Sequence, residues 1–408
     1  MLKPISQDSF VTLLLCTYVK PQEKIVNDYK PFTQKEWIKL STKIAKSDIA
    51  RPSNLYNKSI TELIEELRIN TYEANRIITL LSRSTSMALE VEKFASMGIW
   101  IITRADEQYP KRFKKVLKGM SPNILYGAGD VDILASESIG IVGSRNADVN
   151  SIEFTKKLSE LAVFEDFTVI SGGSKGIDSV AHNSAIDSGG KTIAVLSDGL
   201  SKFIKNKDNL NCILNKQLVV ISPYHPNSRF YSYTALERNK YIYGLSKLTV
   251  ATASDFKKGG TWSGATENIK NNWVPMYVRQ DDSSMGLLEL AKLGAKTLSL
   301  HNFKETTIRG LLKNESVANE FKMVTDSSDK RSEIYTLVWP LIEKHLRKPI
   351  NVKKLSDILE VEEGQLNIWI NIARREGKVK FIDADIVVAS VFYNAEIDQS
   401  EQINMFKL

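Results

Sequence analysis

The chain has 408 residues, of which 42% are apolar and 25% are charged, and it carries a net charge of +7 with an isoelectric point near 9.0. This length exceeds that of one ordinary core, so two or three domains of a globular protein are expected. The basic balance permits contact with a polyanion without requiring it. Cys16 and Cys212 lie far apart and outside any metal-binding spacing, which argues against a disulfide framework or a metal site and favours a reducing cytoplasm.

Residues 1–100 have the apolar spacing of helices, which predicts a helical domain of the helix-hairpin or SAM-like kind. The most apolar stretch, FVTLLLCTYV at residues 10–19, is too short to cross a bilayer and lacks the features of a signal peptide, so it predicts a buried helix face. Thr33 and Ser59 are expected to cap two further helical stretches, the second of which divides near residues 68–73. A helical pair of this kind can pack on a DNA backbone or can belong to a plain bundle.

Residues 101–305 alternate short β-rich runs with amphipathic helical stretches. The runs are apolar almost throughout, which is typical of strands that are covered on both faces. This alternation predicts an α/β fold with a doubly wound, mostly parallel sheet and right-handed crossovers. The expected strands are GIWIIT, SIGIVGS, FTVISGG, KTIAVLS, QLVVISP, KLTVATA, VPMYVR and AKTLSL.

A polar stretch at residues 324–332 is expected to link the sheet to a third domain, residues 331–390. This domain has three helical stretches followed by KVKFIDADIVVAS, whose pattern indicates a β hairpin, and this order predicts a winged helix. Basic residues near the hairpin favour DNA contact, but neighbouring glutamates dilute their charge, so docking of a partner protein is an equal alternative. The basic residues are Arg374, Arg375, Lys378 and Lys380.

Two of the expected strands end in a glycine loop with one basic residue. The first loop, in SIGIVGSRNADVN, carries Arg145, and the second, in FTVISGGSKGIDSVAH, carries Lys175. Glycine lets the backbone approach a ligand closely, and the N–H groups at the start of the following helix favour an anion. Ligands of doubly wound sheets bind beyond such strand ends. The two loops therefore predict phosphate binding, which the basic side chains would strengthen.

The spacing within the loops does not match the common nucleotide enzymes. Neither loop has the GxGxxG spacing with an acidic residue at the end of the next strand, and GGSKGID lacks the GK[ST] ending of a Walker A loop. An enzyme that uses NAD or ATP is therefore disfavoured.

The segment from Gly98 to Leu300 resembles the DprA/Smf family of DNA-processing proteins. Five motifs occur in the order of that family: GIWIITRADEQYPKRFKKVLKGMSPNILYGAGDVDIL, IGIVGSRNA, ISGGSKGIDSVAHNSAIDSGGKTIAVLSDGL, ALERNKYIYGLSKLTVATAS and KKGGTWSGATENIK. The resemblance implies an extended Rossmann domain that binds single-stranded DNA. The residues show no convincing catalytic constellation, and no metal or cofactor is expected. It also implies a homodimer that hands DNA to a RecA-type recombinase during uptake or repair.

Transferred motif by motif, the resemblance assigns DNA or phosphate binding to three segments. The basic residues among them suit phosphate contacts, which fix affinity rather than sequence preference. The assigned residues are Gly143, Ser144, Arg145, Ser171, Gly172, Gly173, Ser174, Lys175, Gly176, Arg238, Asn239 and Lys240.

The sequence departs from the family pattern in several places. Ser174-Lys175 stands where a small residue and Arg are usual, Lys240 stands where Arg is common, and SKFIKNKDN replaces a Tyr-Pro pair. Lys205 or Lys207 in that replacement is a candidate DNA contact. Similar proteins occur in phage-defence and toxin–antitoxin loci, so an alternative role is to restrain a neighbouring toxin protein and sense nucleic acid.

A nucleotide phosphoribohydrolase is the enzymatic alternative, because GGTWSGATE at residues 259–267 is superficially similar to the glycine motif of such enzymes. The glycine spacing differs and the opening proline is missing. Glu267 is the candidate carboxylate for acid/base work, but a helix carboxylate of this kind is expected to be solvated.

Other residues in the loops and helices have plain structural interpretations. His182 is expected to pack or to bond a helix end rather than to act as a base, and Asp178 is expected to cap the helix. With Ser179 they are too ordinary to indicate a triad. Trp262 and the aromatic residues of RFYSYTALERNKYIY can stack on unpaired bases, although packing is expected for at least half of them.

Overall fold

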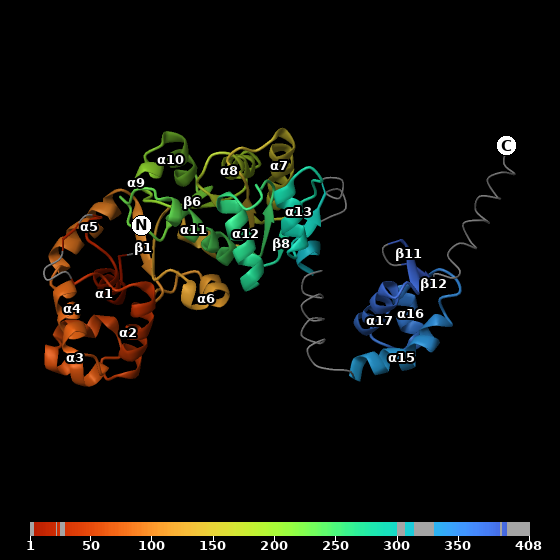
Figure 1. The fold of residues 1–408 in the computed structure, drawn as a ribbon, viewed down its shortest axis with the longest axis horizontal. Coiled ribbons are helices and arrows are strands. Elements are labelled where there is room, and N and C mark those ends of the chain that lie inside the picture. Colours follow the sequence, from red (N-terminus) through yellow and green to blue (C-terminus); the bar gives the residue numbers. More distant parts are fainter. Residues whose placement is uncertain are drawn as a thin grey trace. The chain divides into compact units, whose positions relative to one another are not determined.

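The structure is a computed structural model that describes residues 4–21, 23–24, 29–299, 307–313, 330–383 and 386–389. It contains two compact units, residues 1–315 and residues 316–408, which are described separately (Figure 1). Most of the linker predicted at residues 324–332 lies outside the described residues.

A nine-stranded sheet runs through the described part of the first unit, with the strand order β1-β2-β6-β5-β4-β3-β7-β8-β9. All neighbours from β6 to β9 in this order are parallel, whereas β1 and β2 add to the edge as antiparallel strands. The predicted mostly parallel α/β fold is confirmed. The strands are β1 (Ile99–Thr103), β2 (Ile124–Ala128), β3 (Ser138–Val142), β4 (Thr168–Gly172), β5 (Thr192–Val195), β6 (Leu218–Ser222), β7 (Leu248–Ala251), β8 (Met276–Arg279) and β9 (Lys296–Leu298).

Each of the eight predicted β-rich runs forms a strand, but the sequence pattern missed β2. Glycine inside a strand weakens the β signal, and β2 contains Gly127. The structure requires glycine there, because a Cβ on Gly127 would collide with the ring of Trp100 from β1.

Helices cover both faces of the sheet. On one face, α7 and α8 bury Phe154 and Ile177 against Ile139 and its neighbours. On the other face, α6, α11, α12 and α13 bury side chains such as Phe113 and Tyr243. The helices are α6 (Lys111–Leu117), α7 (Val149–Phe164), α8 (Ile177–Asp187), α9 (Ser201–Ile204), α10 (Lys207–Leu214), α11 (Ser232–Leu245), α12 (Gly259–Asn271) and α13 (Met285–Lys292).

The N-terminal helices share a core with the sheet. Their buried side chains pack in one cluster with Ile99, Tyr126 and Val220. Residues 1–100 therefore lie within the same compact unit as the sheet, and their division as a separate domain stays a prediction. Capping boxes at Thr33 and Ser59 confirm the expected helix starts. The helices are α1 (Gln7–Cys16), α2 (Gln34–Lys46), α3 (Ile60–Leu67), α4 (Thr71–Leu81) and α5 (Ser84–Ser96), with a 3-10 helix at Pro52–Asn57.

The described part of the second unit contains three helices and a small sheet with the strand order β10-β12-β11. Its core includes Trp339, Leu355 and Val387. Within the basic cluster, Lys378 pairs with Glu376 at 2.6 Å. The winged-helix assignment and its role stay predictions. The elements are α15 (Lys330–Glu343), β10 (Ile350–Asn351), α16 (Val352–Leu359), α17 (Glu363–Arg375), β11 (Val379–Asp383) and β12 (Ile386–Ala389).

Among the described residues, no helix combines the length and the apolar character that crossing a membrane requires.

Candidate nucleic-acid interface

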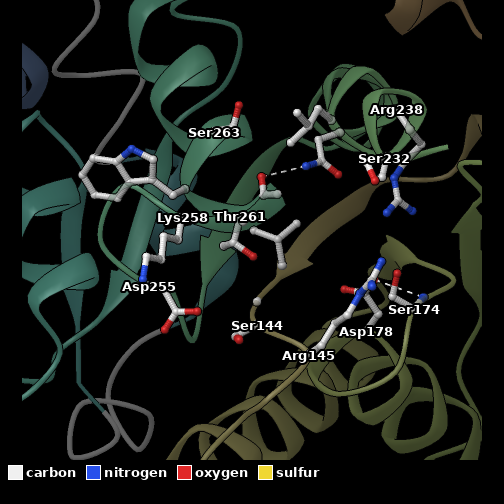
Figure 2. Close-up of a pocket in the computed structure, with 18 of the residues that line it drawn as sticks. Ser144, Arg145, Ser174, Asp178, Ser232, Arg238, Asp255, Lys258, Thr261 and Ser263 are labelled. Carbon is white, nitrogen blue, oxygen red and sulfur yellow. Dashed lines mark hydrogen bonds between the residues drawn. The ribbon is translucent and has the colours of Figure 1, made fainter.

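The order of the strands reverses at β3. From β3 the chain adds β4, β5 and β6 on one side and then returns to place β7 on the other side of β3. Ligands of open α/β sheets bind beyond the carboxyl ends of the strands at such a switch point. Here the loops after β3, β4 and β7, together with α11 and the start of α12, line a cleft of about 670 Å³ (Figure 2).

The first loop follows β3 and carries the exposed Arg145 to the cleft. Gly143 lets the loop approach α8, because a Cβ there would lie 2.5 Å from Cγ1 of Ile177. The amide of Ser144 donates to the carbonyl of Ala253 at 3.0 Å, and the carbonyl of Ser144 accepts from the amide of Ile177 at 3.3 Å. These bonds fix the backbone of the loop on two sides and leave the Arg145 side chain free to meet a ligand.

The second loop follows β4, and Ser171 near the end of that strand is buried. The hydroxyl of Ser171 lies 2.6 Å from the carbonyl oxygen of Ile141 and 2.9 Å from Oδ1 of Asp178. Asp178 in the first turn of α8 also accepts from the amide of Ser174 at 3.3 Å. The carboxylate expected to cap α8 thus ties the loop to the helix instead, and Gly176 occupies the N-cap position.

Arg238 on α11 lines the cleft although its side chain is almost fully buried, with 5% exposure (Figure 2). Its Nη1 donates to the carbonyl of Val195, while its Nε has no hydrogen-bond partner among the described residues. Gly172 makes room for the guanidinium, because a Cβ there would collide with it. Burial lowers the pKa of Arg238 and the nearby Asp178 opposes this shift. An arginine stays charged at neutral pH, so the cleft holds a buried cation with an unused donor.

The two residues that follow Arg238 have other surroundings. Nδ2 of Asn239 donates to the carbonyl of Gly260 at 2.8 Å and so joins α11 to α12 at the cleft. Nζ of Lys240 pairs with Glu237 at 3.1 Å, and Lys240 is not among the residues that line the cleft. The structure therefore brings Arg238 and Asn239 to the predicted site and leaves Lys240 beside it.

The start of α12 contributes residues that the sequence analysis did not assign. Lys257, Lys258 and the first turn of α12 line the cleft, and Figure 2 shows Lys258 and Arg145 on opposite sides of it. No side chain caps the N-terminus of α12, so its first N–H groups are free to bind an anion. The motif KKGGTWSGATENIK covers this segment. In the sequence alone, however, two lysines at the start of a helix cannot be distinguished from ordinary solvated lysines.

A smaller pocket of about 220 Å³ adjoins the cleft, and we name it the side pocket. The cleft and the side pocket share Arg145, Ser174 and Phe230. The guanidinium of Arg145 lies 5.7 Å from the centre of the Phe230 ring. The side pocket is lined by Arg145, Gly173, Ser174, Lys175, Leu196, Ser197, Asp198 and Phe230.

Basic side chains outnumber carboxylates around the two cavities. One of the carboxylates, Asp178, is already held by the second loop. A concave surface with this surplus concentrates anions. The basic residues are Arg145, Lys175, Arg238, Lys257 and Lys258, and the carboxylates are Asp178, Asp198 and Asp255.

Several other candidates lie outside the two cavities. Lys205 and Lys207 are exposed but do not line either of them. Glu267 lies further along α12, where burial raises its pKa, and it too is absent from the residues that line the cleft.

Among the aromatic candidates, Phe230 and Trp262 line the cleft. Tyr241 and Tyr243 are buried in the core, as expected for helix packing.

His182 is buried beneath the second loop. Its Nε2 lies 2.7 Å from the carbonyl oxygen of Gly172 and its Nδ1 faces Oγ1 of Thr192. The neutral imidazole with its proton on Nε2 donates to that carbonyl, so His182 supports the loop that carries Lys175. Burial lowers the pKa of the imidazole.

This lowered pKa makes the stability of the fold depend on pH. In the unfolded chain the imidazole takes up a proton at its ordinary pKa of about 6.5. In the native protein it stays neutral at that pH, so the free energy of unfolding falls as the pH drops below about 6.5. We expect the urea midpoint of unfolding to fall between roughly pH 7.5 and 5.5, and to fall less in His182→Gln. Equal pH dependence in both proteins would contradict this.

Fold and site together define a Rossmann-like α/β protein with a cleft lined by basic side chains at the switch point of its sheet. The profile of the family described as DNA recombination-mediator protein A matches residues 100–307, about half of the chain, and the chain belongs to this family. The resemblance seen in the sequence is thereby confirmed.

Known proteins support this assignment. The chain is 27% identical over 216 residues to DNA processing protein DprA of Streptococcus pneumoniae, covering 52% of this chain and 74% of the relative. It is 26% identical over 210 residues to DprA of Bacillus subtilis, covering 50% and 70%. The X-ray structure of the Streptococcus pneumoniae protein covers 65% of this chain and 95% of its own with a TM-score of 0.50 and 20% identity, which shows a shared fold.

Proposed function

We propose that this protein binds single-stranded DNA and takes part in DNA processing, with the cleft as the site of the phosphate backbone. The observation that carries the proposal is Arg238, a buried cation that lines the cleft and has an unused donor. The described residues give this guanidinium the carbonyl of Val195 as an acceptor and leave its Nε without one. Burying a charge that is only partly hydrogen-bonded is costly, and a phosphate oxygen in the cleft would offset part of that cost. Arg145 and Lys258 add exposed charge on the two sides of the same cleft.

Two features favour an unpaired strand over a small nucleotide or a duplex. The cleft continues into the side pocket, so the positive surface extends over several strand ends. Phe230 and Tyr231 next to it are 45% and 50% exposed, and aromatic side chains of this kind stack on bases that a duplex keeps covered. Contacts to the phosphate backbone carry no sequence information, so affinity in the cleft is set by charge.

The finer role is suggested by the family description, which names a recombination mediator. We propose that the present chain hands its bound strand to a RecA-type recombinase. Dimerisation and a cytoplasmic location belong to the same hypothesis. No contact within the described residues favours the toxin-restraining or hydrolase alternatives.

The proposal is tested by fluorescence anisotropy with a labelled strand of ~30 nucleotides, longer than one binding site. Wild type is expected to bind at low salt, and Arg145→Ala is expected to bind about 10-fold more weakly, because one charge-assisted contact to phosphate is lost. Lys191→Ala is the matched control, since Lys191 is exposed at the amino end of β5, away from the cleft. Absence of binding by wild type would reject the proposed function.

A further inference from the structure

Basic side chains gather on a second surface of the first unit, around α6. Lys114 and Lys115 follow Lys111 by three and four positions, so the three lie on one face of the helix, and all three are exposed. The positive charge continues on Arg104 before the helix and on Lys118 after it. We name this region the α6 surface, and its basic residues are Lys35, Lys39, Arg104, Lys111, Lys114, Lys115 and Lys118.

Helix α2 extends the α6 surface, because it lies against the 3-10 helix Lys118–Met120 that follows α6 (Figure 1). Nε2 of Gln34 on α2 donates to the carbonyl of Gly119 at 2.9 Å. Lys35 and Lys39 are exposed and lie one turn apart on α2, the first of them next to Gln34. The lysines of α2 and α6 therefore belong to one surface.

The carboxylates near the α6 surface are held by other partners. Asp106 accepts from the hydroxyls of Ser6 and Ser9 at 2.9 and 2.6 Å, and Glu36 of α2 pairs with Arg76 at 3.0 Å. None of the seven basic side chains forms an ion pair with a carboxylate in the described part of the chain. Their charge is therefore available to a partner.

Residues 104–118 carry a surplus of positive charge, with six basic and two acidic residues, of which Glu107 is exposed. Burial and the charges of Arg104 and Lys111 lower the pKa of Lys114, while Asp106 opposes this shift. A lowered lysine pKa is expected where like charges crowd together. Such a surface attracts a polyanion, whose charge relieves the crowding.

The α6 surface lacks the features that hold unpaired bases. The aromatic rings of its elements, those of Trp37, Tyr109 and Phe113, are buried, and its basic residues line neither the cleft nor the side pocket. Proteins hold single strands by stacking bases on exposed rings. A duplex keeps its bases covered and presents phosphates to a row of basic side chains. The α6 surface therefore fits a duplex better than a single strand.

The α6 surface and the cleft lie toward opposite ends of α11. A Cβ on Gly244, near the end of α11, would lie 2.7 Å from Cδ1 of Leu117 on α6. Nε of Arg112 on α6 donates to the carbonyl of Ser246, just beyond α11, at 2.8 Å. Ser232, the first residue of α11, lines the cleft. The 14 residues of α11 span about 20 Å, so a strand in the cleft leaves the α6 surface accessible.

We propose that the α6 surface is a second nucleic-acid site, which binds the phosphate backbone of duplex DNA. It is separate from the cleft, so one chain holds a single strand and a duplex at the same time. The proposal goes beyond the proposed function and does not depend on it, because no residue of the α6 surface lines the cleft.

The test is fluorescence anisotropy of the full chain with a labelled duplex of about 20 base pairs, two helical turns, closed by G·C pairs. Wild type is expected to bind this duplex at about 0.05 M salt, where phosphate contacts are strong. The triple variant Lys111→Gln, Lys114→Gln, Lys115→Gln is expected to bind it at least about 10-fold more weakly. Its salt slope is expected to be shallower by about 2.7, which corresponds to three phosphate contacts.

A second triple variant controls for net charge. Lys156→Gln, Lys157→Gln, Lys191→Gln removes the same charge from exposed residues of α7 and of the segment before β5, and it is expected to bind the duplex like wild type. Arg145→Ala is expected to keep its affinity for the duplex while it loses affinity for a single strand, and the α6 triple variant is expected to show the reverse.

The outcomes separate this inference from the proposed function. Absence of duplex binding by wild type, or equal duplex binding by wild type and the α6 triple variant, would overturn the inference and leave the proposed function standing. Loss of single-strand and duplex binding alike in the α6 triple variant would also overturn it, because the surface would then serve the single strand. Binding of the duplex at the α6 surface without any binding of a single strand would support the inference and reject the proposed function.

Discussion

Replacing Gly176 with alanine is expected to abolish binding of single-stranded DNA and to lower the free energy of unfolding by about 3 kcal/mol. Gly176 has a φ of +82°, a backbone conformation that residues with a side chain rarely adopt. A Cβ there would also lie 2.5 Å from the carbonyl oxygen of Arg145 and 2.6 Å from that of Ser144. Gly176 is thus where the first loop touches the start of α8, and alanine would push the two glycine loops apart. Anisotropy and urea denaturation measure the two effects.

Gly189 provides a matched control for this substitution. It also has a positive φ, of +78°, but a Cβ there would meet nothing within 4 Å. Gly189→Ala is therefore expected to cost only about 1 kcal/mol of stability, from the backbone conformation alone, and to bind DNA like wild type. If Gly176→Ala behaved like Gly189→Ala, the contact between the loops would not matter for binding.

Arg238→Met is expected to weaken binding of single-stranded DNA about 100-fold without destabilising the fold. The guanidinium is a buried charged donor, and a charge-assisted contact to phosphate in a desolvated site contributes about 3 kcal/mol. Methionine fills much of the same volume, and Arg238 makes no ion pair within the described part of the chain, so its removal is expected to cost the fold little. The two readouts are anisotropy and the urea midpoint.

Arg238→Lys keeps the charge but loses the planar fork, and is expected to restore part of the affinity. A purely structural role for Arg238 predicts a different pattern, in which Arg238→Met loses stability together with affinity. That pattern would contradict the assignment of Arg238 to the binding site.

The loops could be predicted from the sequence because their signals are local. A β-rich run that ends in glycine and a basic residue, as at Gly143 and Arg145, indicates both the strand and the close approach of the backbone. The capping residues Thr33 and Ser59 were predictable for the same reason, since a cap acts within one turn of its helix.

The division of roles within a motif depends on which way each side chain points, and the motif does not encode that. Arg238 and Lys240 lie two positions apart on α11, so they face different directions, and only Arg238 lines the cleft. Ser171 belongs to the same motif as Lys175, yet it is buried and supports the loop.

The part of the cleft that lies beside β7 could not be predicted from the sequence, because it depends on the tertiary structure. Lys257 and Lys258 follow β7, which lies beside β3 in the sheet although more than a hundred residues separate the two strands in the chain.

The central claim is that the cleft binds the phosphate backbone of a single strand, and the salt dependence of binding tests it most directly. The logarithm of the binding constant of wild type is expected to fall linearly with the logarithm of salt concentration between about 0.05 and 0.2 M. Arg145→Ala is expected to show a slope that is shallower by about 0.7, which corresponds to the loss of one phosphate contact to a single strand. Lys191→Ala is expected to show the same slope as wild type. Binding that does not depend on salt, or equal slopes for wild type and Arg145→Ala, would contradict the account.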